Sequence, residues 1–341
     1  MGDLLAALLT VVIGVGSLCA FLAGLYWLSR FVPEKLREGF RVWIFLGPAS
    51  LFLIIGLVGP TFRTLYFSLL DDNGKSLVWL DNYREIFSNP STRLTVINSL
   101  MWVFLGTSVT VVIGLAIARF ADGMRGEKAA KSMIFIPGAV SLVGAGIIWR
   151  FVYAAPPFKV GLMNQLAGVI PGLPDSMGGT GTRNWLLERG FGAFKPGEGV
   201  PGFNTLLLIV IFIWASTGFA VVVFSAAIKG VPESLIEAAK VDGATTREAF
   251  YKVTLPYIRA TVVTVATTTT IGGLKALDIV TATTGGNFGT STIANEFYKV
   301  KFVQGRDGMG SALAVLIFVL VIPVVVINRR AQRRSEELMG A

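Results

Sequence analysis

Residues 237–256 read EAAKVDGATTREAFYKVTLP and lie between two long apolar segments. A helix is expected just before and within the first half of this stretch. Pro232 suits its first position, because the N–H that proline lacks would be unpaired there anyway, and Glu233 complements the positive end of the helix dipole. Gly243 suits the end of the helix, where the backbone turns left-handed. These residues predict a helix of about three turns.

A second helix is expected directly afterwards. Thr245 and Glu248 have the spacing of a capping box, and Leu255-Pro256 is expected to close the helix before the next apolar segment. The stretch therefore predicts a helical hairpin. On its first helix, side chains that share one face would let a partner approach closely: Leu235, Ala238, Ala239 and Asp242. Taken alone, these residues also fit an ordinary amphipathic surface hairpin that joins two spans.

The composition indicates a membrane protein. Hydrophobic residues make up 53% of the 341 residues and charged residues 15%, whereas a soluble globular chain carries about 25% charged residues. The mean hydropathy is +0.67. Runs without charge have lengths near the ~20 residues that cross a hydrocarbon core: 4–29, 42–62, 94–118, 132–149, 203–228, 260–274 and 311–328. The expected fold is all-α and transmembrane, with about seven helices.

The run after the hairpin is short for a span. It reaches spanning length only if it continues through Lys275 and Asp278 to about Val280. The first run has no basic segment before it and is longer than the apolar part of a signal peptide. We therefore expect it to be a retained helix.

Basic residues alternate between loops, and the positive-inside bias gives the orientation. The loops expected in the cytoplasm contain Arg30, Lys35, Arg37 and Arg41; Arg119, Arg125, Lys128 and Lys131; Lys229, Lys240, Arg247, Lys252 and Arg259; and Arg329, Arg330, Arg333 and Arg334. The N-terminus is then outside, while the hairpin and the C-terminus are cytoplasmic. The net charge of +9 is mostly this topological signal, which disfavours nucleic acid as a partner.

The residue inventory excludes several chemistries. The chain has no histidine and a single cysteine, Cys19, so an intramolecular disulfide, a zinc site and a Ser-His-Asp triad are excluded. No metal site and no catalytic residue is expected. The glycine-rich segment 285–292 lacks the Gly-Lys-Ser/Thr core that grips phosphates. If ATP drives this protein, another polypeptide has to hydrolyse it.

The stretch 237–256 resembles the EAA signature of the membrane subunits of binding-protein-dependent ABC importers, whose pattern is EAA, three residues, Gly, and a later hydrophobic-x-Leu-Pro. In that family the helix is a coupling helix that inserts into a cleft of a cytoplasmic ATPase. The resemblance assigns coupling to the ATPase to seven residues: Glu237, Ala238, Ala239, Asp242, Gly243, Leu255 and Pro256.

Further motifs resemble the carbohydrate permeases of the maltose and alpha-glucoside type. They are WLDNYREIF at 79–87 followed by Asn98-Ser99, WRF at 149–151 leading to GLMN at 161–164, Trp185-Leu186, and LDIV at 277–280 before TGG at 284–286. Leu277 replaces a usual Phe, and Asn287-Phe288 replace Gly-Pro. The resemblance covers about 42–328. It implies a six-helix permease core of the type I importer fold, preceded by an extra N-terminal helix.

The expected organisation has three parts. Residues 1–41 form the extra helix and a cytoplasmic loop, 42–328 form the permease core, and 329–341 form a basic cytoplasmic tail. The core includes an outer loop, 153–202, and the cytoplasmic coupling loop, 229–256. The outer loop is either a flexible tether or a docking and lid region for a binding protein, with runs 161–170 and 185–194 as interfacial helices. The family favours docking.

The resemblance also implies partners in the cytoplasmic (inner) membrane of a prokaryote. A second EAA-type permease would share the pathway, two ATPase subunits would use ATP and Mg, and an extracytoplasmic sugar-binding protein would deliver substrate. This chain would bind no cofactor and act as no enzyme. It would import a sugar, an oligosaccharide or glucoside, by alternating access, because coupling requires different affinities in the two states.

Substrate contacts in such permeases come from the helices on either side of the hairpin. The candidates here are Trp214, Ser216, Phe219, Thr268, Thr269, Gly273, Lys275 and Asp278. Aromatic faces and hydroxyls suit a sugar. Threonines and glycines in membrane helices also serve backbone bonding and close packing, however. Phe212 stands where the family has asparagine. Lys275 and Asp278 could pair at i, i+3 as a gate or mark the end of a helix, and the second interpretation is favoured.

Three other functions share parts of this pattern. A permease for a non-sugar solute is the nearest, and the motifs at 79–87 and 277–286 favour sugar over it. A secondary transporter would have no use for the EAA stretch and would show coupling carboxylates or repeats. A membrane enzyme would need paired carboxylates or metal ligands in its spans.

Overall fold

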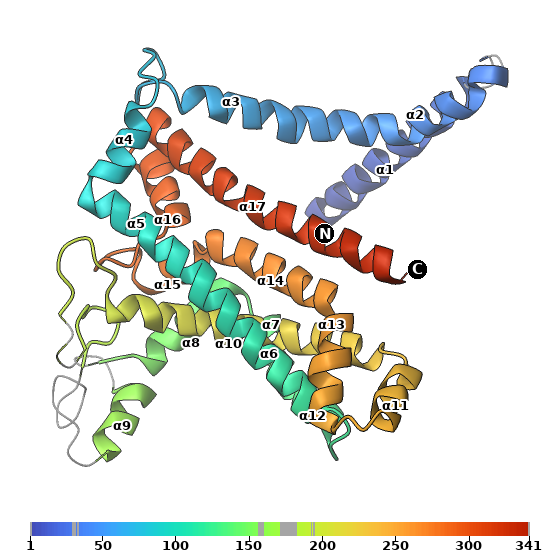
Figure 1. Ribbon diagram of the computed structural model, residues 1–341. Coiled ribbons are helices and arrows are strands. Elements are labelled where there is room, and N and C mark those ends of the chain that lie inside the picture. Colours follow the sequence, from blue (N-terminus) through green and yellow to red (C-terminus); the bar gives the residue numbers. More distant parts are fainter. Residues whose placement is uncertain are drawn as a thin grey trace. The chain divides into compact units, whose positions relative to one another are not determined.

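The computed structural model describes residues 2–28, 32, 34–155, 160–170, 183–191, 193 and 195–339. Helices joined by loops make up this part of the chain, and no β-strand occurs within it (Figure 1). The all-α fold class predicted from the sequence is therefore confirmed. The chain divides into two compact units, residues 1–66 and 67–341.

The first unit consists of two helical limbs and is distinct from the predicted hairpin at 229–256. Its helices are α1 (Gly2–Leu28) and a long second limb made of α2 (Glu34–Leu53), the π-helical turn η2 (Ile54–Val58) and α3 (Gly59–Phe67). Large apolar side chains such as Val12 and Phe52 are exposed along both limbs, as expected for helices whose solvent is lipid. The boundary expected between residues 41 and 42 falls inside α2.

The second unit contains the remaining helices, which begin with α4 (Asp81–Ser88), α5 (Pro90–Met101), the π turn η3 (Trp102–Gly106) and α6 (Thr107–Ala121). A second group consists of α7 (Glu127–Ala139), α8 (Leu142–Val152), α9 (Leu162–Val169) and α10 (Phe203–Lys229). The hairpin region consists of α11 (Glu233–Val241), α12 (Thr246–Ala249), the π turn η5 (Phe250–Thr254) and α13 (Leu255–Tyr257). The last group consists of α14 (Arg259–Leu274), α15 (Asp278–Thr283), α16 (Ile293–Tyr298), the π turn η6 (Lys299–Val303) and α17 (Asp307–Met339).

Four helical stretches in the described residues are long and apolar enough to cross a membrane: Leu46–Phe67, Pro90–Ala121, Phe203–Lys229 and Asp307–Arg333. The expected span 132–149 is instead a broken pair, α7 and α8, bent by 99°. Pro137 lies inside the last turn of α7, and Ser141 caps α8 with its side chain. The chain therefore restarts a helix at the bend.

The helix after the hairpin does not reach Val280. It ends at Leu274 after 16 residues, and α15 begins separately at Asp278. Two glycines precede this end, Gly272 and Gly273, and glycine weakens a helix interior. The helix of the run 260–274 thus does not continue through Lys275 and Asp278, and it stays shorter than a full-length span.

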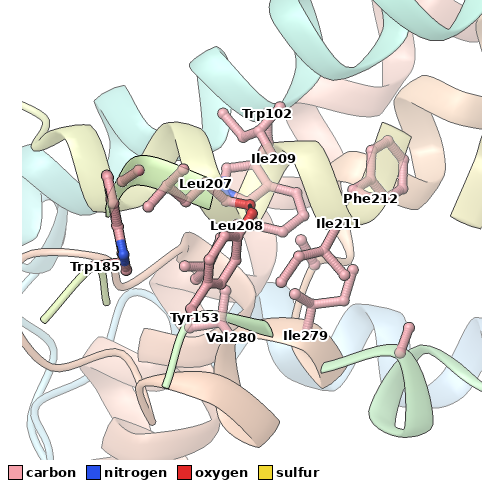
Figure 2. Packing of buried hydrophobic residues seen from close by; sticks show 13 residues of the cluster. Trp102, Tyr153, Trp185, Leu207, Leu208, Ile209, Ile211, Phe212, Ile279 and Val280 are labelled. Atoms are coloured by element: carbon pink, nitrogen blue, oxygen red, sulfur yellow. Dashed lines mark hydrogen bonds between the residues drawn. The ribbon is translucent and has the colours of Figure 1, made fainter. Parts of the chain in front are cut away.

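The core of the second unit lies along α10, which Figure 1 shows running through the centre of this unit. Its residues contribute to two of the buried clusters, and Figure 2 shows one of them, with Leu208 and Ile211 packed among side chains from other helices. Gly114 of α6 allows close approach, because a Cβ there would lie 2.6 Å from the Cβ of Ala220. Small residues at such crossings are typical of membrane helices.

Polar contacts join distant segments near α4, α5 and α16. The Asn98 amide donates to the carbonyls of Gly289 (2.8 Å) and Ser291 (2.9 Å). Arg306 lies 2.6 Å from the Asp72 carboxylate and 3.1 Å from that of Glu85, and these two partners raise the pKa of Arg306. These bonds tie the 79–87 motif, through Glu85, to Arg306, and tie Asn98 to the loop that follows the 284–286 motif.

Candidate coupling and translocation sites

The predicted hairpin is present, with a small shift at its start. Pro232 is the residue before the helix rather than its first residue, and α11 begins at Glu233. The fixed backbone of proline sits at φ −56° and ψ 128° there, which places the chain outside the helix. At the other end Gly243 has φ +84°, so the predicted left-handed turn is confirmed. The N–H of Ala244 closes it by donating to the Ala239 carbonyl (2.9 Å).

The predicted capping box begins the second limb. The Glu248 N–H donates to the Thr245 hydroxyl oxygen (3.3 Å), and the Thr245 N–H donates to the Glu248 carboxylate (3.0 Å). The bonds from Thr245, together with Lys252 at 3.1 Å, lower the pKa of Glu248 to about 2. The carboxylate is therefore ionised throughout the physiological range, as the cap requires.

Leu255-Pro256 does not close the second limb, so that expectation was wrong. The chain stays helical through α12, η5 and α13 to Tyr257, and α14 begins at Arg259. Proline lacks the N–H for a regular helical bond. The wide turn η5 directly precedes it, with the Leu255 N–H donating to the Phe250 carbonyl five residues back. The second limb consequently runs into α14 with one residue outside regular helix, Ile258, between them.

The first limb faces away from the rest of its chain. No residue of α11 is buried, and Val241 is 88% exposed. Most of the candidate coupling residues are exposed as well: Glu237, Ala238, Asp242, Gly243 and Pro256. Ala239 and Leu255 are partly buried. A short helix with no buried residue has a surface free for another protein. Its docking partner stays a prediction.

Two contacts at the base of the hairpin were not predicted. The Glu127 carboxylate lies 2.5 Å from Lys131 and 2.5 Å from Lys229, the last residue of α10. The Arg119 guanidinium lies 5.2 Å from the centre of the Phe250 ring, in η5. Arg119, Lys131 and Lys229 were noted only as orientation signals. The sequence carried no spacing signal for the Glu127–Lys229 and Arg119–Phe250 contacts, because the partners are more than a hundred residues apart.

The structure places the candidate residues on α10 in different surroundings. Trp214 is partly buried and packs edge to face on Trp149 of α8, with ring centroids 5.7 Å apart. Phe219 is 39% exposed, and Ser216 is partly buried. Phe212, which stands at the family's asparagine position, is buried beside Trp102 (Figure 2). Its ring fills the space left by Gly106 and Gly272, so it acts in packing.

The candidate hydroxyls on α14 bond to their own helix. Thr268 donates to the Thr264 carbonyl (3.0 Å), and Thr269 donates to the Val265 carbonyl (2.9 Å). Such bonding to a carbonyl four residues back satisfies a hydroxyl without a ligand. Thr268 is exposed and Thr269 buried, so only Thr268 presents a free surface to anything outside the chain.

The last three candidates lie at the end of α14. Gly273 permits a close crossing, because a Cβ there would lie 3.3 Å from the Trp102 carbonyl oxygen. Lys275 caps α14, and Asp278 is the first residue of α15. No ion pair joins these two side chains among those of the described residues. They mark helix ends, which was the favoured interpretation.

The described part of the outer loop contributes buried side chains to the core along α10. A helix is present in the run 161–170, where one was expected, as α9. The one expected at 185–194 is absent in its described residues, because Trp185 is only 3% exposed and its indole N–H donates to the Asn164 side chain (2.7 Å). Arg183 lies 5.3 Å from the ring centres of Trp185 and Phe191. Pro156, Pro157, Pro171 and Pro174 lie outside the described residues.

Comparison with known proteins defines the family. The family described as "Binding-protein-dependent transport system inner membrane component" matches residues 96–337. The osmoprotective compounds uptake permease protein GgtC of Synechocystis sp. is 39% identical over 298 residues, 86% of this chain and 100% of that protein. The alpha-glucoside transport system permease protein AglF of Rhizobium meliloti is 35% identical over 357 residues, 98% of this chain and 99% of that protein.

Two solved structures show the same fold. The membrane chain of a bacterial ABC transporter involved in the import of the acidic polysaccharide alginate has a TM-score of 0.70 at 17% identity, over 88% of this chain and 98% of that one. A bacterial alginate ABC transporter in complex with a pentasaccharide-bound periplasmic protein has a TM-score of 0.68 at 18% identity, over 88% and 96% of the two chains.

The chain therefore belongs to the family of inner-membrane components of binding-protein-dependent transport systems. It is a multi-pass membrane protein with the ABC importer permease fold, as predicted from its sequence. Members of this family are transporter subunits rather than enzymes.

Proposed function

We propose that this chain is the permease subunit of an ATP-driven importer and that it forms, with a second EAA-type permease, the pathway for a sugar. The observation that carries the proposal is the exposed hairpin of residues 229–256. No residue of its first limb, α11, is buried, and its second limb continues into α14. A partner that moves the hairpin would thus move a helix of the proposed pathway.

The energy source is a separate pair of ATPase subunits that use ATP and Mg. This chain offers no phosphate-binding Gly-Lys-Ser/Thr segment. Glu237, Ala238, Ala239, Asp242 and Gly243 would dock on one ATPase subunit, and Leu255 and Pro256 would support the second limb. Closure of the ATPase dimer would then tilt the docked hairpin, and the bundle would alternate between inward-facing and outward-facing states. The positive-inside bias supports an outside N-terminus and a cytoplasmic C-terminus.

The substrate class rests on the relatives. One is named an alpha-glucoside transport permease and another a trehalose/maltose transport permease. Trp214, Ser216 and Phe219 of α10 and Thr268 of α14 would contribute an aromatic face and hydroxyls to the pathway, which suit the C–H faces and hydroxyls of a glucoside. Thr269, Gly273, Lys275 and Asp278 would support the helices by packing and capping.

An extracytoplasmic binding protein would deliver the sugar to the outer loop, 153–202. The buried Trp185 and Arg183 give the described part of this loop a fixed shape, which favours a docking surface over a flexible tether. A structural neighbour of this chain was solved with a periplasmic protein bound to its transporter. A non-sugar solute is the second candidate, because one relative is named for osmoprotective compounds.

Uptake by the intact complex tests the proposal. The chain, purified through a tag on its C-terminus, should bring down a second permease and an ATPase, and cells should import radiolabelled maltose, trehalose or methyl alpha-glucoside only when the chain is present. Radiolabelled glycine betaine serves as the non-sugar control. Import of betaine without any of the three sugars would overturn the sugar assignment. ATP hydrolysis by the chain purified away from its partners would overturn the division of labour.

A further inference from the structure

The turn between α6 and α7 contacts both ends of the coupling hairpin. We define the α6–α7 turn as residues 119–131. At one end of it, Arg119 lies over the ring of Phe250, at 5.2 Å from its centre, and Phe250 begins η5 in the second limb. At the other end, Glu127 lies 2.5 Å from Lys229, which is three residues before Pro232 and the first limb. One short segment thus contacts the start of the hairpin, at Lys229, and its second limb, at Phe250.

The Glu127 contacts form a compact charged cluster. Glu127 also lies 2.5 Å from Lys131 and accepts the Gly123 N–H at 3.1 Å, which orients its carboxylate from inside the turn. Lys131 donates to the hydroxyl of Ser225 on α10, and Asp122 lies 3.6 Å from Lys229. Two carboxylates therefore face two ammonium groups, and every one of the four has an opposite charge within 4.0 Å.

The cluster joins two helices that are already packed along their length. Gly218 of α10 lies against the α7 backbone, where a Cβ would come within 2.5 Å of the Ile134 carbonyl oxygen. Beyond this contact α7 ends at the 99° bend to α8, and α8 packs on Trp214 through Trp149. A displacement at Lys229 therefore has a continuous route through Glu127 and α7 to the bend.

We propose that Glu127 and Arg119 are positioning residues for coupling, which hold the two limbs of the hairpin to the α6–α7 turn so that a displacement of the hairpin is transmitted to α7 as well as to α10 and α14. The proposal rests on the proposed function of the hairpin. A partly exposed ion pair such as Glu127–Lys229 adds little to stability by itself. Its effect is expected on the transmission of hairpin movement to α7, because that transmission requires both limbs to keep their positions against the α6–α7 turn.

The test measures coupling in the intact transporter, reconstituted in liposomes with its binding protein. The readout is the number of sugar molecules imported per ATP hydrolysed, with the sugar of the maltose, trehalose and methyl alpha-glucoside panel that the wild type imports. Glu127→Gln, Lys229→Met and Arg119→Met should each lower this ratio about fivefold while ATP hydrolysis continues. Lys229→Arg and Arg119→Lys keep the cation and should retain most of the ratio.

Controls separate transmission from folding. Asp307→Asn removes an ion pair of the same 2.5 Å separation, with Lys301 at the outer end, and should leave the ratio unchanged. Lys229 is 54% exposed, so Lys229→Met tests the pair even if Glu127→Gln lowers the abundance of the chain. The double variant Glu127→Gln/Lys229→Met should lose less than the sum of the two single losses, because both single variants remove the Glu127–Lys229 pair.

Three outcomes of these measurements would count against parts of the proposal. If Gly243→Val in the hairpin uncouples transport while Lys229→Met and Arg119→Met keep the wild-type ratio, the positioning role of the α6–α7 turn is wrong and the hairpin function stands. If Gly243→Val also keeps the wild-type ratio, the coupling function of the hairpin is itself wrong. Additive losses in the double variant would show that Glu127 and Lys229 do not act as a pair.

Discussion

The coupling hairpin and the interior around α10 are built in different ways. In the hairpin, conformation is decided locally, by the left-handed Gly243 and by the Thr245–Glu248 cap, and most side chains are exposed. Around α10, position is decided by residues far apart in sequence, as where Gly218 meets the backbone of α7. A change in the hairpin should therefore alter what the protein does, whereas a change in the interior should alter whether it folds.

The largest effect should come from Gly218→Val. A Cβ there would lie 2.5 Å from the Ile134 carbonyl oxygen and 2.8 Å from the Phe135 Cα, and backbone atoms cannot move aside as a flexible side chain can. Overpacking of this kind costs ~1–3 kcal/mol or more. We expect at least about a tenfold loss of the chain from membranes, measured by quantitative immunoblotting. Gly16→Val, whose Cβ meets nothing within 4 Å, should keep normal abundance.

The second effect sharpens the contrast, because Gly243→Val should leave abundance near normal and still abolish most uptake. A β-branched side chain at φ +84° costs about 1–2 kcal/mol of backbone strain and redirects the hairpin. Glu237→Lys should act alike by reversing a charge on the exposed limb. Uptake of radiolabelled sugar into cells is the measurement. Gly305→Val, at φ +71° on another turn, is the matched control, and equal uptake in all three variants would show that the hairpin is only a connector.

A smaller effect is expected from Thr245→Ala, which removes the cap. Loss of an N-cap costs about 1 kcal/mol, or roughly fivefold in the opening equilibrium of the first turn of the second limb. Hydrogen exchange of the amides of residues 246–249 should accelerate by about that factor. The pKa of Glu248 should rise only in part from about 2, because alanine keeps the backbone N–H that lowers it most and removes only the hydroxyl donor. Unchanged exchange would mean that packing, rather than the cap, starts this limb.

The smallest effects separate the two kinds of pathway residue. Thr269→Val should change uptake less than about twofold, because this buried hydroxyl already bonds to its own helix. Trp214→Ala should reduce uptake several-fold more, because the partly buried indole packs on Trp149 and offers the proposed aromatic face. Concentration-dependent uptake measurements would compare the two, and a larger loss in Thr269→Val would move the sugar contacts onto α14.

These contrasts explain what the sequence could predict. The hairpin was predictable because glycine, proline and a capping pair act on their own neighbours. The apolar runs identified most helices, and the run 260–274 gave the end of α14 at Leu274. The bend at Pro137 was missed, since hydropathy does not register where a helix restarts. The Glu127–Lys229 and Arg119–Phe250 contacts joined residues that no local pattern relates. The interfacial helix expected from Trp185 failed because its side chain is buried against Asn164 instead.

The wide turn η5 sets the rotational phase between the hairpin and α14. Each residue of an α-helix advances the chain by about 100° around the axis, and a π turn accommodates one extra residue within a helix. The face that α12 presents is therefore offset by one residue from the face that α14 would continue without η5. A single deletion within 250–252 could therefore be absorbed by a return to regular winding, and it should turn the second limb far less than the about 100° that the same deletion causes in an uninterrupted α-helix.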